Sequence, residues 1–271
     1  MKDELLYNFY VFSGNPVSRS SLKIDLKQKI VYEVVRLIEG VPLFFEDHFQ
    51  RLLNSISIFK IHFDFPEMHL FQSVKLLMST TGVTKGNIKI SVTYSKSENK
   101  LVYYIYFIEH KYPSESEYLN GVRLKSFRAV RRNPRFKMYL PVLKKNINEF
   151  IKEKDIYEVV LLKNNILTEG SKSNLFFIRN QTLFTTPEEL VLTGITRKYV
   201  KKICEENHFS WIEKKIKLKD IHNYESCFIS GTSPMILPVR QLDETFFQVH
   251  NSLLRNIMNK YDEKINAYIH G

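Results

Sequence analysis

The chain has 271 residues, of which 44% are hydrophobic and 25% are charged, a composition typical of a soluble globular protein with one large domain or two modest ones. Two cysteines, Cys204 and Cys227, exclude a disulfide framework and favour a reducing compartment. No apolar run approaches the ~18 residues of a membrane span, and residues 1–5 lack a signal-peptide pattern. We therefore expect a cytoplasmic protein that needs no membrane partner.

The net charge of +11 indicates attraction to anionic partners, such as nucleic acid or a phosphorylated ligand. The lysines are spread along the chain, with local basic clusters at residues 128–135 and 214–219. No nucleic-acid-binding motif accompanies these clusters, so we expect no nucleic-acid partner.

The first third predicts strands with two helices. Residues 7–12 and 30–38 are apolar and rich in aromatic or β-branched side chains, which indicates strands. Apolar residues recur at helical spacing in residues 46–60, and Pro66 opens a second predicted helix to about residue 79. Alternation over residues 88–94 and an apolar run at 101–108 predict a hairpin. We expect a meander with two helices packed on it, ending in a linker at residues 111–117.

The rest of the chain mixes strands and helices. The predicted strands are 122–126, 157–162, 175–178, 182–185 and 226–230, and the predicted helices are 141–154, 193–207 and 249–269. Asn164 and Asn165 predict a tight turn, because asparagine tolerates left-handed backbone conformations. Thr193 is the expected N-cap of its helix. Without regular βαβ alternation, this order indicates an α+β fold, with domains at 1–112 and 120–271 and a linker at 113–119.

Lys137 is a candidate nucleophile. It follows a proline-containing loop at residues 131–135 and precedes the apolar residues 138–140. A lysine amine in apolar surroundings loses solvation of its charged form and becomes nucleophilic, and such lysines form Schiff bases with carbonyl groups. Taken alone, the position also suits a solvent-exposed lysine.

Glu169 precedes Gly170 at the end of a predicted hairpin, where backbone geometry can aim a carboxylate inward. Facing a pyridine nitrogen, such a carboxylate keeps that nitrogen protonated and makes the ring an electron sink. A solvent-exposed hairpin glutamate is the alternative.

Two turns and one arginine could hold a phosphate. Residues 193–196 (Thr-Gly-Ile-Thr) begin a predicted helix, whose free N–H groups and dipole attract anions. Residues 230–233 (Ser-Gly-Thr-Ser) follow a strand and offer a second set of donors. Arg51 could reach a phosphate with two donors, or pair on the surface with Asp47. His48 is expected to be a structural histidine, and no cysteine and histidine spacing indicates a metal site.

The order and spacing of these motifs resemble the fold-type IV pyridoxal-phosphate enzymes, the class IV aminotransferases. Residues 46–52 are similar to that family's acidic-His-x-x-Arg-Leu helix, and residues 192–197 to its Gly-Ile-Thr-Arg turn. The resemblance implies a two-domain homodimer with a smaller N-terminal α/β domain and a larger C-terminal domain built on a pseudo-barrel sheet. It also implies pyridoxal 5'-phosphate (PLP) as cofactor and assigns roles to six residues. Lys137 would form the Schiff base and Glu169 would face the pyridine nitrogen, while the phosphate would be held by Arg51, Ile195, Thr196 and Thr232.

Tyr32 and Arg36 match substrate-pocket positions of relatives. Elsewhere this chain departs from the family. Val142 stands where many branched-chain enzymes have a tyrosine, and Leu140 where related members have an asparagine. The strand 91–95 lacks the arginine and histidine with which D-amino acid aminotransferases bind the substrate carboxylate.

Three functions stay open from the sequence. The first is an aminotransferase that moves an amino group between an amino acid and a 2-oxo acid. The second is a 4-amino-4-deoxychorismate lyase with the same cofactor, and the third is a binding relative without catalysis.

Overall fold

A computed structural model describes residues 5–21, 28–61, 66–151 and 155–271. The chain packs as two compact units, and each is described by itself. The first unit comprises residues 1–111, 136–139 and 268–271, and the second comprises 112–135 and 140–267. Residues 136–139, which include Lys137, thus pack with the N-terminal half although they lie in the middle of the sequence.

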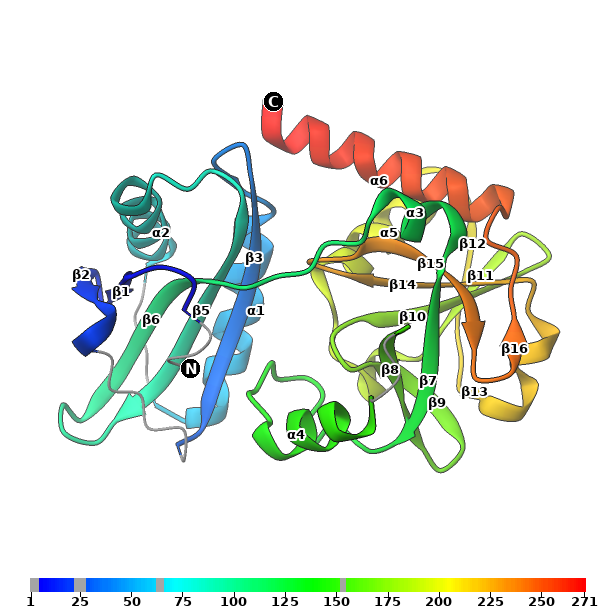
Figure 1. Ribbon diagram of the computed structural model, residues 1–271, viewed down its shortest axis with the longest axis horizontal. Coiled ribbons are helices and arrows are strands. Elements are labelled where there is room, and N and C mark those ends of the chain that lie inside the picture. The colour runs from blue at the N-terminus through cyan, green and yellow to red at the C-terminus, as the bar shows by residue number, and fades with distance from the viewer. Residues whose placement is uncertain (1–4, 22–27, 62–65, 152–154) are drawn as a thin grey trace. The chain divides into compact units, whose positions relative to one another are not determined.

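Among its described residues, the first unit has a six-stranded sheet in the order β2-β1-β6-β5-β3-β4 (Figure 1). Its pairings are antiparallel, and the longest are β3 with β5 and β5 with β6. The elements are β1 (Phe9–Phe12), β2 (Asn15–Ser18), β3 (Ile30–Ile38), β4 (Val41–Pro42), α1 (Phe45–Ile56), α2 (Glu67–Thr81), β5 (Gly86–Ser95) and β6 (Lys100–Ile108).

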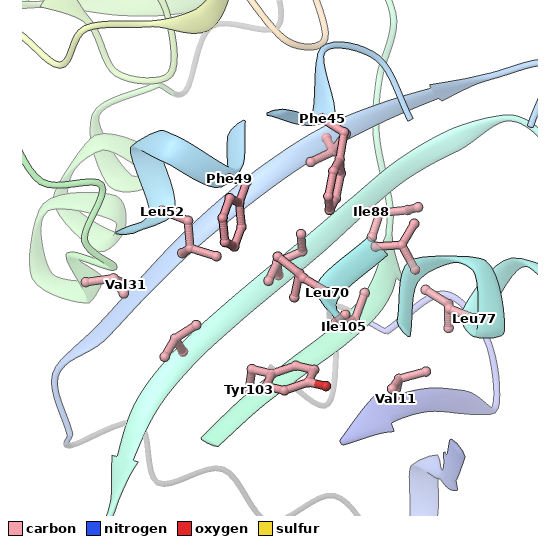
Figure 2. Packing of buried hydrophobic residues seen from close by; sticks show 14 of the residues in the cluster. Val11, Val31, Phe45, Phe49, Leu52, Leu70, Leu77, Ile88, Tyr103 and Ile105 are labelled. Carbon is pink, nitrogen blue, oxygen red and sulfur yellow. The ribbon is translucent and has the colours of Figure 1, made fainter. Parts of the chain in front are cut away.

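The core of the first unit lies between one face of this sheet and the two helices. Figure 2 shows Phe49 and Leu52 of α1 and Leu70 of α2 over the strand residues Val31 and Ile105. Burial alternates along β3, because successive side chains point to opposite faces of a strand. The two predicted helices are confirmed, and β3, β5 and β6 follow one another as in the predicted meander, but the first strand, β1, pairs with β6 rather than with β3.

The second unit is built on a larger sheet. Within the described residues its strands follow the order β12-β11-β10-β14-β15-β7-β8-β9-β13, with β16 paired to β15. The elements are α3 (Glu115–Asn120), β7 (Val122–Arg128), α4 (Pro141–Phe150), β8 (Ile156–Lys163), β9 (Ile166–Gly170), β10 (Asn174–Arg179), β11 (Thr182–Thr185), α5 (Ile195–Glu206), β12 (Ser210–Glu213), β13 (Ile216–Lys217), β14 (Ser226–Gly231), β15 (Met235–Leu242), β16 (Thr245–Phe246) and α6 (Ser252–His270).

Turn chemistry explains how β8, β9 and β10 follow one another. Asn164 and Asn165 have positive φ angles of 50° and 63°, so the predicted asparagine turn is confirmed. It returns the chain along β9, which ends at Glu169 and Gly170. The sharp turn therefore sets where the candidate carboxylate lies.

Three local predictions differ from the structure. Helix α5 begins at Ile195 with Gly194 as its N-cap, so the expected N-cap at Thr193 is wrong. Residues 115–120, partly within the expected linker, form α3. A capping box between Ser114 and Glu117 stabilises the N-terminus of this helix. Helix α4 ends at Phe150, and residues 152–154 of the predicted helix lie outside the described residues.

Both cysteines are free, as expected without a disulfide framework, and both are buried. In the parts of the chain that the structure describes, no helix is long and apolar enough to cross a membrane.

Replacing Leu70 by alanine tests the core of the first unit. Leu70 is fully buried on α2, so Leu70→Ala should lower the free energy of unfolding by about 2–5 kcal/mol through lost burial and a residual cavity. Met68, on the same helix, is 60% exposed, and Met68→Ala is the matched control with little expected change. Urea unfolding followed by circular dichroism measures both, and equal effects would contradict this packing.

Candidate active site

The backbone of Lys137 is held by two elements of the first unit. Its carbonyl accepts a 2.9 Å hydrogen bond from the amide of Tyr32 on β3, and its own amide donates to Oγ of Ser55 on α1 at 3.0 Å. The amide of Tyr139 donates to the carbonyl of Ile30 at 2.9 Å, and Met138 forms an isolated antiparallel bridge with Val31 of β3. Lys137 therefore has a fixed root from which its side chain extends.

The amine of Lys137 lies in an aromatic environment that contains a second lysine. Its Nζ is 5.2 Å from the ring centre of Tyr32, and Nζ of Lys89 is 5.1 Å from the same ring. Lys89 is only 5% exposed, and its Nζ also lies 5.4 Å from the ring of Tyr139 and 5.9 Å from that of Tyr106. The faces of aromatic rings attract cations, and the attraction is stronger where water is excluded. Sequence reasoning missed Lys89, because it stands at a polar position of a strand in which apolar and polar residues alternate, a pattern typical of a solvent-facing side chain.

Arg51 forms a buried ion pair with Glu33. Its Nε donates to Oε1 of Glu33 at 2.8 Å and its Nη2 donates to Oε2 at 2.6 Å, the two-pronged geometry that favours arginine. Glu33 is completely buried on β3, and Nδ1 of His48 lies 2.8 Å from its Oε2. His48 is thus a hydrogen-bonded structural histidine, as predicted, whereas Glu33 was missed.

The charges of this cluster follow from its contacts. Burial opposes ionisation of Glu33, but the charge and hydrogen bonds of Arg51 and His48 outweigh it and bring the Glu33 pKa to about 2. Burial lowers the pKa of His48 despite Glu33, with Arg51 and Lys137 adding to the lowering. Because an ionised Glu33 can only accept, Nδ1 of His48 carries the hydrogen of the bond to its Oε2.

Tyr32 and Arg36 lie four residues apart on β3, on the face opposite Glu33, and both are half-buried. Their role in substrate binding stays a prediction.

Glu169 is buried in the second unit at 2% exposure, so the alternative of a solvent-exposed hairpin glutamate is wrong. Its Oε1 accepts a 2.7 Å hydrogen bond from Nε of Arg131. Its Oε2 accepts from the backbone amide of Leu192 at 3.1 Å, which ties the carboxylate to the turn before α5.

The start of α5 has no side-chain cap. Gly194 caps the helix without a side-chain cap hydrogen bond, so the positive end of the helix dipole offers backbone amides. A Cβ on Gly194 would lie 2.2 Å from Oδ1 of Asn174, and Nδ2 of Asn174 is committed to the carbonyl of Leu192 at 2.8 Å. Only glycine fits this close approach.

The second predicted phosphate turn lies beside the first. Ser230 of β14 pairs with Asn174 of β10, and its buried Oγ has no hydrogen-bond partner among the described residues. Ile195 and Thr196 are buried in the first turn of α5, and Thr232 is half-buried just after β14. An uncapped helix start, an orphaned hydroxyl and a buried carboxylate fit a ligand that carries a phosphate and a protonated ring nitrogen.

The predicted site residues thus fall into two groups. The first unit carries Lys137 and Arg51 near Glu33, together with Tyr32 and Arg36. The second unit brings together Glu169, the turn at residues 192–196 and the turn at 230–232.

Residues 30–242 match the family model for amino-transferase class IV, which is most of the chain. The chain belongs to the class IV amino-transferase family. The family predicted from the sequence is therefore confirmed, and the members of this family are pyridoxal-phosphate enzymes.

Curated and solved relatives agree with this family. The D-alanine aminotransferase of Bacillus licheniformis is 25% identical over 250 residues, covering 86% of this chain and 88% of the relative. A branched-chain aminotransferase of the archaeon Thermoproteus uzoniensis, solved with norvaline, has a TM-score of 0.85 at 20% identity and covers 97% of this chain and 96% of its own. The 4-amino-4-deoxychorismate lyase of Pseudomonas aeruginosa has a TM-score of 0.82 at 18% identity, covering 95% and 99%. The likeness to the solved chains confirms the predicted fold.

Three ionisable partners of the site had no motif to reveal them. Glu33 and Arg131 lie far in sequence from Arg51 and Glu169, which they bind. Glu158 accepts hydrogen bonds from Oγ of Ser173 at 2.9 Å and Oγ of Ser171 at 3.1 Å, and so holds the loop after Glu169. A buried carboxylate with such partners cannot be read from local sequence.

Acid should remove the stabilisation that Glu33 supplies. Its folded pKa of about 2 lies below the ordinary value of 4.5, so the stabilisation is complete above pH 4.5 and disappears as the pH falls towards 2. The shift corresponds to about 3 kcal/mol. Glu33→Gln should therefore differ most from the wild type in free energy of unfolding at neutral pH, and the difference should shrink in acid.

Urea unfolding of both proteins from pH 7 to about pH 2 measures this difference. Glu109→Gln, at an exposed position of the same unit, is the control. A difference that stays constant across the range would show that Glu33 is not ionised by its partners.

Gly194→Ala should disturb the start of α5. The added methyl group overlaps Asn174, which is buried and bonded, so one of them must shift at a cost of about 1–3 kcal/mol in unfolding free energy. The affinity for PLP should fall with it, because the helix amides move. Absorbance titration with PLP and urea unfolding measure the two effects. Lys198→Ala, at an exposed position of the same helix, should change neither; wild-type affinity in Gly194→Ala would count against an anion site here.

Proposed function

We propose that the protein is a PLP-dependent aminotransferase that moves an amino group between an amino acid and a 2-oxo acid. The observation that carries the proposal is the buried carboxylate of Glu169, bonded to the amide of Leu192 just before the uncapped start of α5. This arrangement suits a ring nitrogen and a phosphate of one ligand, and it occurs in a chain of the class IV family.

In this proposal the carboxylate faces the protonated ring nitrogen, and the amides and the arginine face the phosphate. Glu169 holds a proton on the ring nitrogen, so that the cofactor, when bound, supplies an electron sink for the substrate's α-carbon. The first amides of α5, with Thr196 and Thr232, receive the phosphate, and Arg51 adds a cation. The ion pair with Glu33 holds the Arg51 guanidinium in one orientation.

Lys137 would hold the cofactor through its amine and would be the base that moves the proton at the substrate's α-carbon. Its backbone bonds to Ser55 and Tyr32 keep the root of the side chain still while the amine moves.

We propose Tyr32 and Arg36 as substrate-side residues and assign no chirality to the substrate. The curated relatives are named D-alanine aminotransferases, but β5 has neither arginine nor histidine in residues 91–95. A cytoplasmic homodimer stays a prediction.

A lyase acting on 4-amino-4-deoxychorismate is the second candidate. The likeness of the fold to the Pseudomonas aeruginosa lyase and the net charge of +11, which suits a polyanionic substrate, favour it. Product analysis separates the two activities: exchange of amino groups between amino acids and 2-oxo acids supports the transferase, and pyruvate released from aminodeoxychorismate supports the lyase.

Lys137→Ala tests the proposed function. Borohydride reduction of the wild type with PLP should attach one reduced cofactor to the peptide that carries Lys137, as mass spectrometry would detect. The variant should fold normally and lose both this label and turnover by several orders of magnitude, because the amine proposed to hold the cofactor is removed. Lys145→Ala, at an exposed position of α4, should keep both. A label or turnover that survives in Lys137→Ala would reject the assignment.

A further inference from the structure

We propose that Arg131 is a positioning residue, which keeps Glu169 ionised and fixed in orientation so that it can hold a proton on the ring nitrogen of PLP. The inference rests on the proposed function and adds a residue that no motif marks.

Arg131 contacts both the carboxylate and the loop that follows it. Its Nε donates to Oε1 of Glu169 at 2.7 Å, and its Nη2 donates to the carbonyl of Ser171 at 3.1 Å. The Arg131 side chain is 10% exposed and that of Glu169 is 3% exposed, so water screens their attraction weakly. One planar guanidinium thus fixes the orientation of the Glu169 carboxylate relative to the backbone of Ser171.

The two oxygens of Glu169 have different partners. The guanidinium binds Oε1, while the amide of Leu192 binds Oε2 at 3.1 Å. A carboxylate can accept about four hydrogen bonds, so its oxygens can serve both of these donors and a protonated ring nitrogen together. Arg131 and the Leu192 amide approach from defined directions and thereby orient the carboxylate for a third donor.

The loop itself has a second support. Glu158 accepts hydrogen bonds from Oγ of Ser171, Oγ of Ser173 and the amide of Lys172. Removing the Arg131 guanidinium therefore leaves residues 171–173 bonded to Glu158. The main effect is that the Glu169 carboxylate loses its cationic partner.

A buried carboxylate without a cation favours its protonated form, because an ionised group is costly to remove from water. Arg197 also acts on Glu169 electrostatically, but its guanidinium is bonded to Thr185, Thr186 and Glu213. Arg131, by contrast, touches the carboxylate directly. Without it, Glu169 would be neutral more often and would hold a ring proton less well.

The test is a double-mutant cycle on PLP affinity. Absorbance titration would give the PLP dissociation constant of the wild type, Arg131→Gln, Glu169→Gln and the double variant. We expect Arg131→Gln to weaken binding about tenfold in the wild-type background, the value of one charged hydrogen bond, and less than about twofold when Glu169 is already Gln. Arg131→Lys, which keeps the charge, should recover part of the loss.

Arg132→Gln is the matched control, since Arg132 is the neighbouring residue in the same loop. The melting temperature of each apo-protein is measured alongside, and if Arg131→Gln does not fold, the cycle is completed with Arg131→Lys. An equal loss in both backgrounds, or an Arg131→Gln variant that behaves like Arg132→Gln, overturns the inference. A wild type that binds no PLP instead refutes the proposed function.

Discussion

The buried carboxylates of Glu33 and Glu169 each have an arginine partner and a further hydrogen-bond donor, and the candidate site depends on that pairing. Glu33 is charged because Arg51 and His48 surround it, and Glu169 is bonded to a guanidinium and an amide. Each pair fixes the orientation of both members. Leaving either carboxylate unpaired would cost free energy, so each stays in the one orientation that keeps its partners. A binding site requires such fixed orientations.

The close approach of backbones provides the complementary feature. Gly194 and Asn174 lie too near each other for any side chain at Gly194, and Ser230 pairs with Asn174 across two strands. This packing brings the start of α5 next to the end of β14. Amide donors from two distant parts of the sequence become neighbours, which suits an anion with several oxygens.

Lys137 illustrates how the two units share one stretch of chain. Lys137, whose backbone is bonded within the first unit, lies six positions after Arg131, which is bonded within the second. Anchors at both ends restrict the conformations of the connecting loop. Lys137 is therefore held by its own backbone hydrogen bonds and by the anchoring of the chain at Arg131, six residues before it.

The sequence by itself determined many of the strands, though not β12 or β15, most helices and the candidates Lys137, Glu169 and Arg51, because these rest on periodicity, on turn residues such as Asn164 and on motifs that are local in the chain. It also predicted the family. Only the tertiary structure decided that Gly194 rather than Thr193 caps α5, that Arg51 pairs with Glu33, and that Arg131 pairs with Glu169. The physical reason is range: side chains 18 and 38 positions apart meet only after sheets and helices have packed, and no local pattern records that meeting.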